Sequence, residues 1–208
     1  MSSPTNLLSE IVLEELRKIE LTRKRVEALH SNGQLFKRDI EFIYEGMFLK
    51  ATTVFESFLE NLFIGILYGK YKPMSRKKLN KYDFHSRKMV EDILLRNKNY
   101  ENWMPYEKIR DKANVFYKDG KPFSIMDSSE KGTLKKIMFI RNAIAHKSKY
   151  SDKQFRKQIV SVEALPNKIK NPSSYLRYVF RHMPAQTKFE VYMNQLSLIA
   201  NKIANYNG

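Results

Sequence analysis

The chain has 208 residues, of which 42% are hydrophobic, so it can bury one sizeable core. It contains no cysteine, which excludes disulfides, thiolate metal sites and a cysteine nucleophile, and its seven glycines and seven prolines favour long regular elements over a loop-rich sheet protein. A formal net charge of +16 is large for this size and attracts polyanions.

Two long amphipathic helices are predicted at the start of the chain. Residues 6–31 repeat apolar side chains at helical spacing up to Asn32-Gly33, and residues 35–69 carry a wider apolar face that ends at Gly69. The short turn between them predicts an antiparallel pair. Charged residues interrupt the most apolar stretch, 48–68, which indicates a core helix and not a membrane span. No secretory signal is visible, so we expect a cytoplasmic protein without a membrane partner.

The rest of the chain predicts shorter helices separated by loops. Residues 70–88 form a basic connector, and apolar periodicity predicts helices near 85–97, 106–116, 129–147 and 186–206. A turn is expected at 119–122, N-cap candidates occur at 127–130, and an ordered loop or hinge is expected at 161–174. No segment alternates like a convincing strand. The predicted fold class is all-α, a helical bundle built on the long antiparallel pair with a C-terminal helix, in one domain over 1–208.

The positive charge is unevenly distributed along the chain. Residues 1–60 contain 8 Lys or Arg and 10 Asp or Glu, a net charge of −2. Residues 61–208 contain the other 30 Lys or Arg and 12 Asp or Glu, a net charge of +18. A field of this sign favours contact with nucleic acid and a strong salt dependence of binding. A lysine-rich, solvated surface is the alternative interpretation.

The residues best suited to catalysis lie at the end of the helix predicted over 129–147. Arg141, Asn142 and His146 fall within six positions there. A histidine that moves a proton and an arginine that holds a phosphoryl oxygen are in principle enough to cleave RNA without a metal. Asn142 and His146 share a face, whereas Arg141 and His146 lie about 140° apart in a straight helix. Fraying near His146, or a second copy of the helix across a twofold axis, would bring the two together.

A structural role for the same residues is the alternative. Arg141 would then pair with Glu56 or Glu60 of the long second helix, and His146 would interact with the C-terminal end of its own helix, where cations are favoured.

Three segments resemble the HEPN superfamily, and most of all its RiboL-PSP-HEPN branch. They are Ala113–Phe123, the Ile140–Ser148 segment with its Arg-Asn-x-x-x-His motif, and Ala51–Glu60 with its acidic positions. The resemblance covers roughly residues 35–160, and residues 161–208 would add a linker and the C-terminal helix. It implies a HEPN-like helical bundle that forms a homodimer, in which two Arg-His motifs face one composite cleft.

The resemblance also implies an activity. Competent members of the superfamily are metal-independent endoribonucleases, often toxins or effectors of antiviral defence, so RNA is the expected substrate and an antitoxin or defence-system protein a further expected partner. No cofactor and no metal are predicted. His146 would act as general base or acid, Arg141 would stabilise charge on the phosphate oxygens, and Asn142 would orient the phosphate or the imidazole. Glu56 or Glu60 would hold Arg141 in place.

Basic and aromatic residues after the motif are candidates for RNA contact, namely Lys147, Lys149 and Tyr150. Two other functions remain open from the sequence. One is a non-catalytic HEPN-like module that binds a nucleotide, RNA or a protein partner through its basic face. The other is a structural helical adaptor in which Arg141 forms an internal salt bridge.

Overall fold

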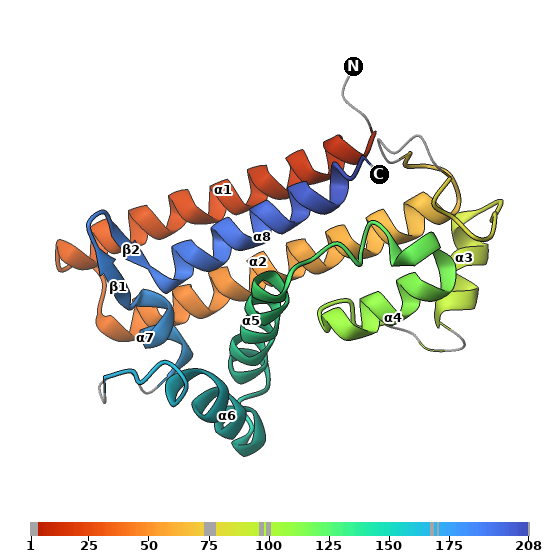
Figure 1. The fold of residues 1–208 in the computed structure, drawn as a ribbon. Helices are drawn as coiled ribbons and strands as arrows, with labels where there is room; N and C mark the ends of the chain where they lie inside the picture. The colour runs from red at the N-terminus through yellow and green to blue at the C-terminus, as the bar shows by residue number, and fades with distance from the viewer. Residues whose placement is uncertain are drawn as a thin grey trace. The chain divides into compact units, whose positions relative to one another are not determined.

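The protein is mostly helical in a computed structural model that describes residues 4–72, 78–95, 98, 101–166, 169 and 171–207 (Figure 1). Over these residues the chain forms eight α-helices and one small hairpin. The helices are α1 (Pro4–Ser31), α2 (Lys37–Leu67), α3 (Arg87–Leu95), α4 (Tyr106–Phe116), α5 (Ser128–His146), α6 (Lys149–Phe155), α7 (Pro172–Arg177) and α8 (Lys188–Ala204). A 3₁₀ turn, η1 (Lys118–Gly120), follows α4, a π-helical turn, η2 (Arg156–Val160), extends α6, and the hairpin strands are β1 (Val179–His182) and β2 (Ala185–Thr187).

The chain divides into two compact units. The first unit comprises Met1–Leu13, Val54–Leu134 and Ser197–Gly208, and the second comprises Glu14–Thr53 and Lys135–Leu196. Helices α1, α2, α5 and α8 each contribute residues to both units.

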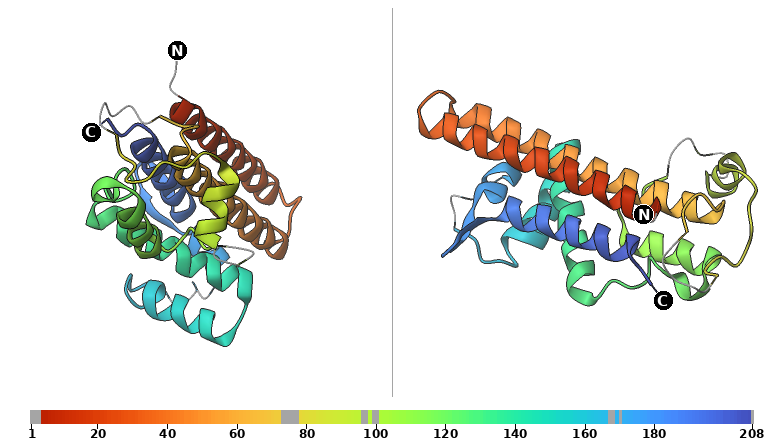
Figure 2. Two further views of the ribbon diagram at one scale, coloured as in Figure 1. Left: turned by 90° about the vertical axis from the view of Figure 1, so that its right-hand side faces the viewer. Right: turned by 90° about the horizontal axis from the view of Figure 1, so that it is seen from above.

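In the second unit, α1 and α2 pack side by side in opposite directions, as both views of Figure 2 show. Ile40, Tyr44 and Phe48 recur every four residues along α2 and are fully buried. Tyr44 and Phe48 pack against α8, where the ring of Phe189 lies 5.3 Å from that of Tyr44 and 6.3 Å from that of Phe48. The aromatic contacts thus join a helix near the start of the chain to one near its end.

Ion pairs with carboxylates tie together further elements of the second unit. Glu163 accepts from Lys136 at 2.6 Å and from Lys188 at 2.7 Å, and Glu27 of α1 accepts from Arg177 of α7 at 2.9 Å. Burial alone would raise the pKa of both carboxyl groups. The hydrogen bonds from these cations outweigh burial, so the pKa of Glu163 and that of Glu27 are lowered.

Aromatic residues form the core of the first unit. The ring of Phe63 in α2 lies 5.2 Å from Trp103, 5.0 Å from Tyr117 and 4.9 Å from Phe123. The Tyr117 hydroxyl donates to the Phe63 carbonyl oxygen at 2.5 Å, which satisfies the polar atom of a fully buried side chain.

Local signals at the helix ends explain where two elements stop and start. Gly33 has a φ of +74° after α1, and the Gln34 N–H donates to the Leu29 carbonyl at 2.9 Å, which closes the helix. Before α5, Asp127 Oδ1 accepts from the Glu130 N–H at 2.9 Å, while Glu130 Oε2 accepts from the Asp127 N–H at 2.8 Å. This reciprocal capping box confirms the N-cap predicted there.

The predicted helices are confirmed, and the chain is mostly helical as expected. The segments 6–31, 35–69, 106–116, 129–147 and 186–206 correspond to α1, α2, α4, α5 and α8 within a few residues. The segment 85–97 corresponds to α3, although residues 96 and 97 lie outside the described ones, as do 73–77 of the connector and 167, 168 and 170 of the predicted loop.

The expectation of no strand is wrong, and two short helices were missed. β1 pairs antiparallel with β2, and an irregularity between Val179 and Arg181 breaks the register, so the sequence does not alternate cleanly. Helices α6 and α7 span only seven and six residues, too few for an apolar period to emerge. Their caps, Ser148 and Asn171, are the signals that could have located them.

Replacing Gly65 is expected to destabilise the protein. A Cβ added at this position in α2 would overlap the Tyr71 ring, so Gly65→Ala should lower the free energy of unfolding by about 1–3 kcal/mol. Gly132 of α5 is the matched control, because a Cβ there meets nothing within 4 Å. Gly132→Ala should stabilise by about 0.5–1 kcal/mol through helix propensity, as measured by urea denaturation. Equal effects of both substitutions would contradict the packing described for Gly65.

Stability is expected to fall in acid, because the pKa of Glu163 and that of Glu27 lie below the ordinary value of 4.5. Carboxylates of this kind stabilise the folded state above pH 4.5 and lose that contribution as the pH falls through the lowered pKa. Glu163→Gln should cost about 1–3 kcal/mol at pH 7 and flatten the loss of stability below pH 4.5. Glu14→Gln, at an exposed ion pair with Arg17, should change little. Denaturant titrations at several pH values test this, and an unchanged acid slope in Glu163→Gln would refute it.

Candidate functional site

The Arg-Asn-x-x-x-His motif occupies the last two turns of α5, in the second unit. Ile137, Ile140 and Ile144 are buried and orient the helix, so Arg141 and Asn142 are half-buried while His146, the last helical residue, is exposed. The apolar stripe therefore leaves all three polar side chains of the motif at least partly accessible to solvent.

Arg141 and His146 come together within one chain. Arg141 Nη1 lies 3.4 Å from His146 Nε2, and the same nitrogen donates to Asn142 Oδ1 at 3.2 Å. The angular separation expected from a straight helix is bridged because the arginine side chain is long and extends toward the helix end. A second copy of the helix is thus not needed to bring these two groups into contact.

The contact depends on how α5 ends. Lys147 has a φ of +43°, which turns the backbone out of the helix directly after His146. Ser148 then caps α6 through a capping box with Ser151, whose N–H donates to Ser148 Oγ at 3.1 Å. His146 therefore lies at a corner between two helices, with its side chain open to solvent.

The residues predicted to contact RNA lie at the same corner. Lys147 is 65% exposed, and its Nζ lies 3.4 Å from Glu45 Oε2 of α2. Lys149 and Tyr150 are in the first turn of α6; both are exposed, and Tyr150 is 72% exposed. The corner thus combines a histidine, an arginine, two lysines and an accessible aromatic ring.

The predicted supporting carboxylates, Glu56 and Glu60, belong to the first unit. Glu56 accepts from the Trp103 N–H at 3.1 Å, which connects α2 to the loop before α4. The pKa of Glu60 is raised, mainly by burial and further by the nearby carboxylates of Glu91 and Glu56. Arg141 belongs to the second unit, and its expected pairing with Glu56 or Glu60 stays a prediction.

His30, another histidine of the second unit, has a structural contact. Its Nδ1 lies 2.8 Å from the carbonyl oxygen of Leu35, so the ring bridges the turn between α1 and α2. This hydrogen bond occupies one of the two imidazole nitrogens of His30.

Sequence reasoning missed Phe42 and Arg38 of α2. The guanidinium carbon of Arg38 lies 5.4 Å from the centroid of the Phe42 ring, and Lys147 Nζ lies 5.7 Å from it. Phe42 is 51% exposed. The sequence does carry a signal for Phe42: it lies two positions from both Ile40 and Tyr44, so it falls on the face of α2 opposite the buried stripe.

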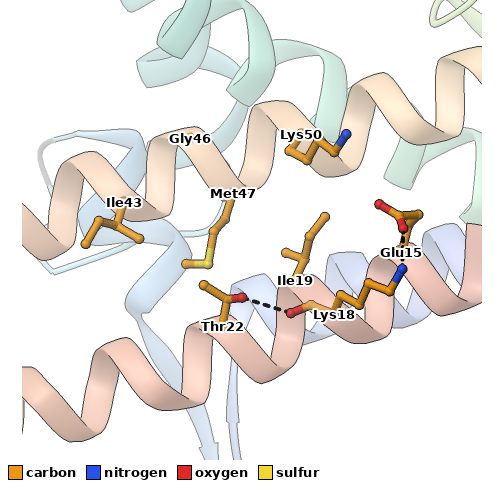
Figure 3. Close-up of a pocket in the computed structure, with 8 residues that line it drawn as sticks. All are labelled: Glu15, Lys18, Ile19, Thr22, Ile43, Gly46, Met47 and Lys50. Atoms are coloured by element: carbon orange, nitrogen blue, oxygen red, sulfur yellow. Dashed lines mark hydrogen bonds and ion pairs between the residues drawn. The ribbon is translucent and has the colours of Figure 1, made fainter.

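An open groove of about 420 Å³ lies between α1 and α2 in the second unit (Figure 3). Ile19, Ile43 and Met47 line it, and Glu15 and Lys18 form an ion pair with each other at 2.8 Å along one side. Lys50 of α2 also lines the groove, so the charged side chains around its apolar lining sum to one positive charge.

The described part of the chain has neither a metal-binding cluster nor a membrane-spanning helix. No cluster of three or more His, Asp or Glu side chains is arranged to hold a metal ion among these residues. None of the described helices combines the length and apolarity needed to cross a membrane.

Comparison of the chain with protein-family models, with curated proteins and with solved structures gives no match. A functional assignment therefore rests on the chemistry and geometry of the chain's own residues.

Proposed function

We propose that the protein is a metal-independent endoribonuclease that cleaves RNA by attack of a ribose 2′-OH on the adjacent phosphorus. The observation that carries the proposal is the 3.4 Å separation of Arg141 Nη1 and His146 Nε2 at the solvent-exposed end of α5. An imidazole and a guanidinium at this distance can act on neighbouring atoms of one phosphodiester.

His146 supplies the base in this proposal. For Arg141 to donate to Nε2, the imidazole must be neutral with its proton on Nδ1, which leaves Nε2 as the acceptor. When the guanidinium turns to the phosphate, this Nε2 lone pair is released and can take the proton of the 2′-OH as the 2′-oxygen bonds to phosphorus. Because DNA lacks this hydroxyl, it would not be cleaved.

Arg141 supplies positive charge where negative charge develops. Its guanidinium can bind the non-bridging phosphate oxygens, with which it forms paired hydrogen bonds more readily than a lysine would. Asn142 Oδ1 accepts from Nη1 at 3.2 Å and so holds the guanidinium beside the imidazole. Asn142 is therefore assigned a positioning role.

The leaving 5′-oxygen needs a proton when its bond to phosphorus breaks. A base at the 2′-oxygen and an acid at the 5′-oxygen act on opposite sides of the phosphorus, and one imidazole cannot occupy both positions at once. A second His146 from another copy of the chain would supply the acid, which is why a homodimer with a composite site is part of the proposal. The products would be a 2′,3′-cyclic phosphate and a free 5′-hydroxyl.

Two further features support the assignment. The net charge of +18 on residues 61–208 attracts RNA, and Lys147 and Lys149 extend positive charge from the candidate site. The resemblance of the motif to the HEPN superfamily agrees with the same chemistry. A role as a toxin or antiviral effector, with an antitoxin or defence partner, is proposed from that resemblance alone.

His146→Ala and Arg141→Ala should each reduce cleavage of single-stranded RNA by about 10²- to 10⁴-fold, because each removes a group that acts in the transition state. Cleavage by the wild type should continue in EDTA and yield a 2′,3′-cyclic phosphate, detected by mass spectrometry. His85→Ala and Arg17→Ala, which alter exposed residues of the same types, should leave the rate unchanged. Thermal melts should show that all four variants are folded.

The outcome separates the proposal from its alternatives. Undiminished cleavage in both motif variants would contradict the enzymatic role of the Arg141–His146 pair. RNA binding without cleavage in any variant would instead indicate a binding module, and a loss of stability in Arg141→Ala without any RNA effect would indicate a structural adaptor.

The composite site predicts that activity depends on dimer formation. Specific activity should fall as the protein is diluted through the range in which sedimentation shows dimers dissociating, because each monomer then lacks the second imidazole. Binding of RNA should fall less steeply over the same range. If monomers prove as active per chain as dimers, the composite site is wrong and one Arg141–His146 pair suffices.

A further inference from the structure

Phe42 is a large aromatic residue of α2 whose side chain lies outside the core of the second unit. The buried face of α2 runs through Ile40 and Tyr44, and each lies two positions, or about 200°, from Phe42 around the helix. Phe42 remains 51% exposed. Burying a phenylalanine ring stabilises a folded protein, and the exposed part of the Phe42 ring does not make this contribution in the isolated chain.

Two cations surround the exposed ring. The Arg38 guanidinium carbon lies 5.4 Å from its centroid and Lys147 Nζ lies 5.7 Å from it. Both distances fall within the range of cation–π contact. An aromatic surface flanked by an arginine and a lysine matches the chemistry by which proteins hold single-stranded nucleic acid: the ring stacks a base and the cations bind phosphates.

Lys147 connects this ring to the candidate active site. It directly follows His146, so the two Cα atoms are about 3.8 Å apart, and its side chain reaches back across to α2. There its Nζ contacts both the Phe42 ring and Glu45 Oε2, the latter at 3.4 Å. The aromatic surface and the Arg141–His146 pair are thus linked through a single residue.

We propose that Phe42, Arg38 and Lys147 form a subsite that stacks one nucleobase of a single-stranded RNA beside the Arg141–His146 pair. The inference rests on the proposed function and names its substrate class: RNA with unpaired bases, held with little preference among the four. Only an unpaired base can leave its neighbours and stack on a side chain. Since every base has a π-face, the ring supplies affinity without sequence readout.

Charge favours RNA over a second copy of the chain as the occupant of this surface. Another copy carries the same net charge of +16, whereas RNA brings phosphates to Arg38 and Lys147. Glu45 is the acidic group in contact with Lys147, and Glu41 lies 3.9 Å from Lys37 on the same helix. A phosphate would compete with Glu45 for the Lys147 ammonium group.

Binding is best measured in the His146→Ala background, which isolates it from cleavage. The probe is a short single-stranded RNA with one 2-aminopurine, whose fluorescence is quenched when the base stacks. Phe42→Leu should weaken binding by about 5- to 150-fold and abolish the quenching, while Phe42→Trp should retain both. Phe36→Leu is the matched control, because Phe36 is 80% exposed and, within the part of the chain that the structure describes, lacks the cations that lie over the Phe42 ring. It should bind like the parent protein.

Failure of this inference is distinguishable from failure of the proposed function. If the otherwise wild-type enzyme cleaves RNA and Phe42→Leu leaves both KM and binding unchanged, the subsite is wrong while the nuclease stands. If no variant cleaves but binding still depends on an aromatic side chain at position 42, the subsite stands as an RNA-binding site and the nuclease is wrong. If Phe42→Leu instead converts a dimer to a monomer without changing RNA binding per chain, the surface is a self-interface and the inference is overturned.

Discussion

The left-handed turn at Lys147 is the constraint on which the candidate site depends. A residue other than glycine with a φ of +43° costs about 1–2 kcal/mol in backbone energy. Contacts on both sides offset this cost: Ser148 caps α6, and the Lys147 side chain contacts Glu45 and the Phe42 ring. Because α5 stops at this turn, the His146 ring is not covered by a further helical turn, and the Arg141 side chain can reach it.

Charge in the second unit is arranged so that several carboxylates neutralise cations internally. Glu163 binds Lys136 and Lys188, and Glu27 binds Arg177. These pairs lower the pKa of both carboxyl groups, so they remain ionised and paired at neutral pH and stabilise the contacts among α1, α5, α7 and α8. The cations at the corner after α5 are more exposed, with Lys147 at 65%, and these would meet an approaching polyanion first.

The sequence predicts most of the helices and the location of the candidate site, for identifiable reasons. Long apolar stripes define α1, α2 and α8, and the Asp127–Glu130 capping box marks the start of α5. The hairpin escapes prediction because its strands are short and its register is broken after Val179. The Arg141–His146 contact also escapes, because helical angles locate Cβ atoms and not the ends of long side chains. Phe42 is missed since its partner Lys147 lies far away in the sequence.

The two parts of the candidate site therefore have different requirements. Arg141, Asn142 and His146 are neighbours on one helix, and their mutual contacts need little more than α5 and its end. Phe42 comes from α2 and meets Lys147 only when α2 and the corner after α5 pack within the folded second unit. A short Arg-His string can thus recur by chance without a place to hold RNA. In the proposed mechanism, proton transfer is local to the string, whereas placing a nucleobase beside it depends on how α2 and the corner after α5 pack.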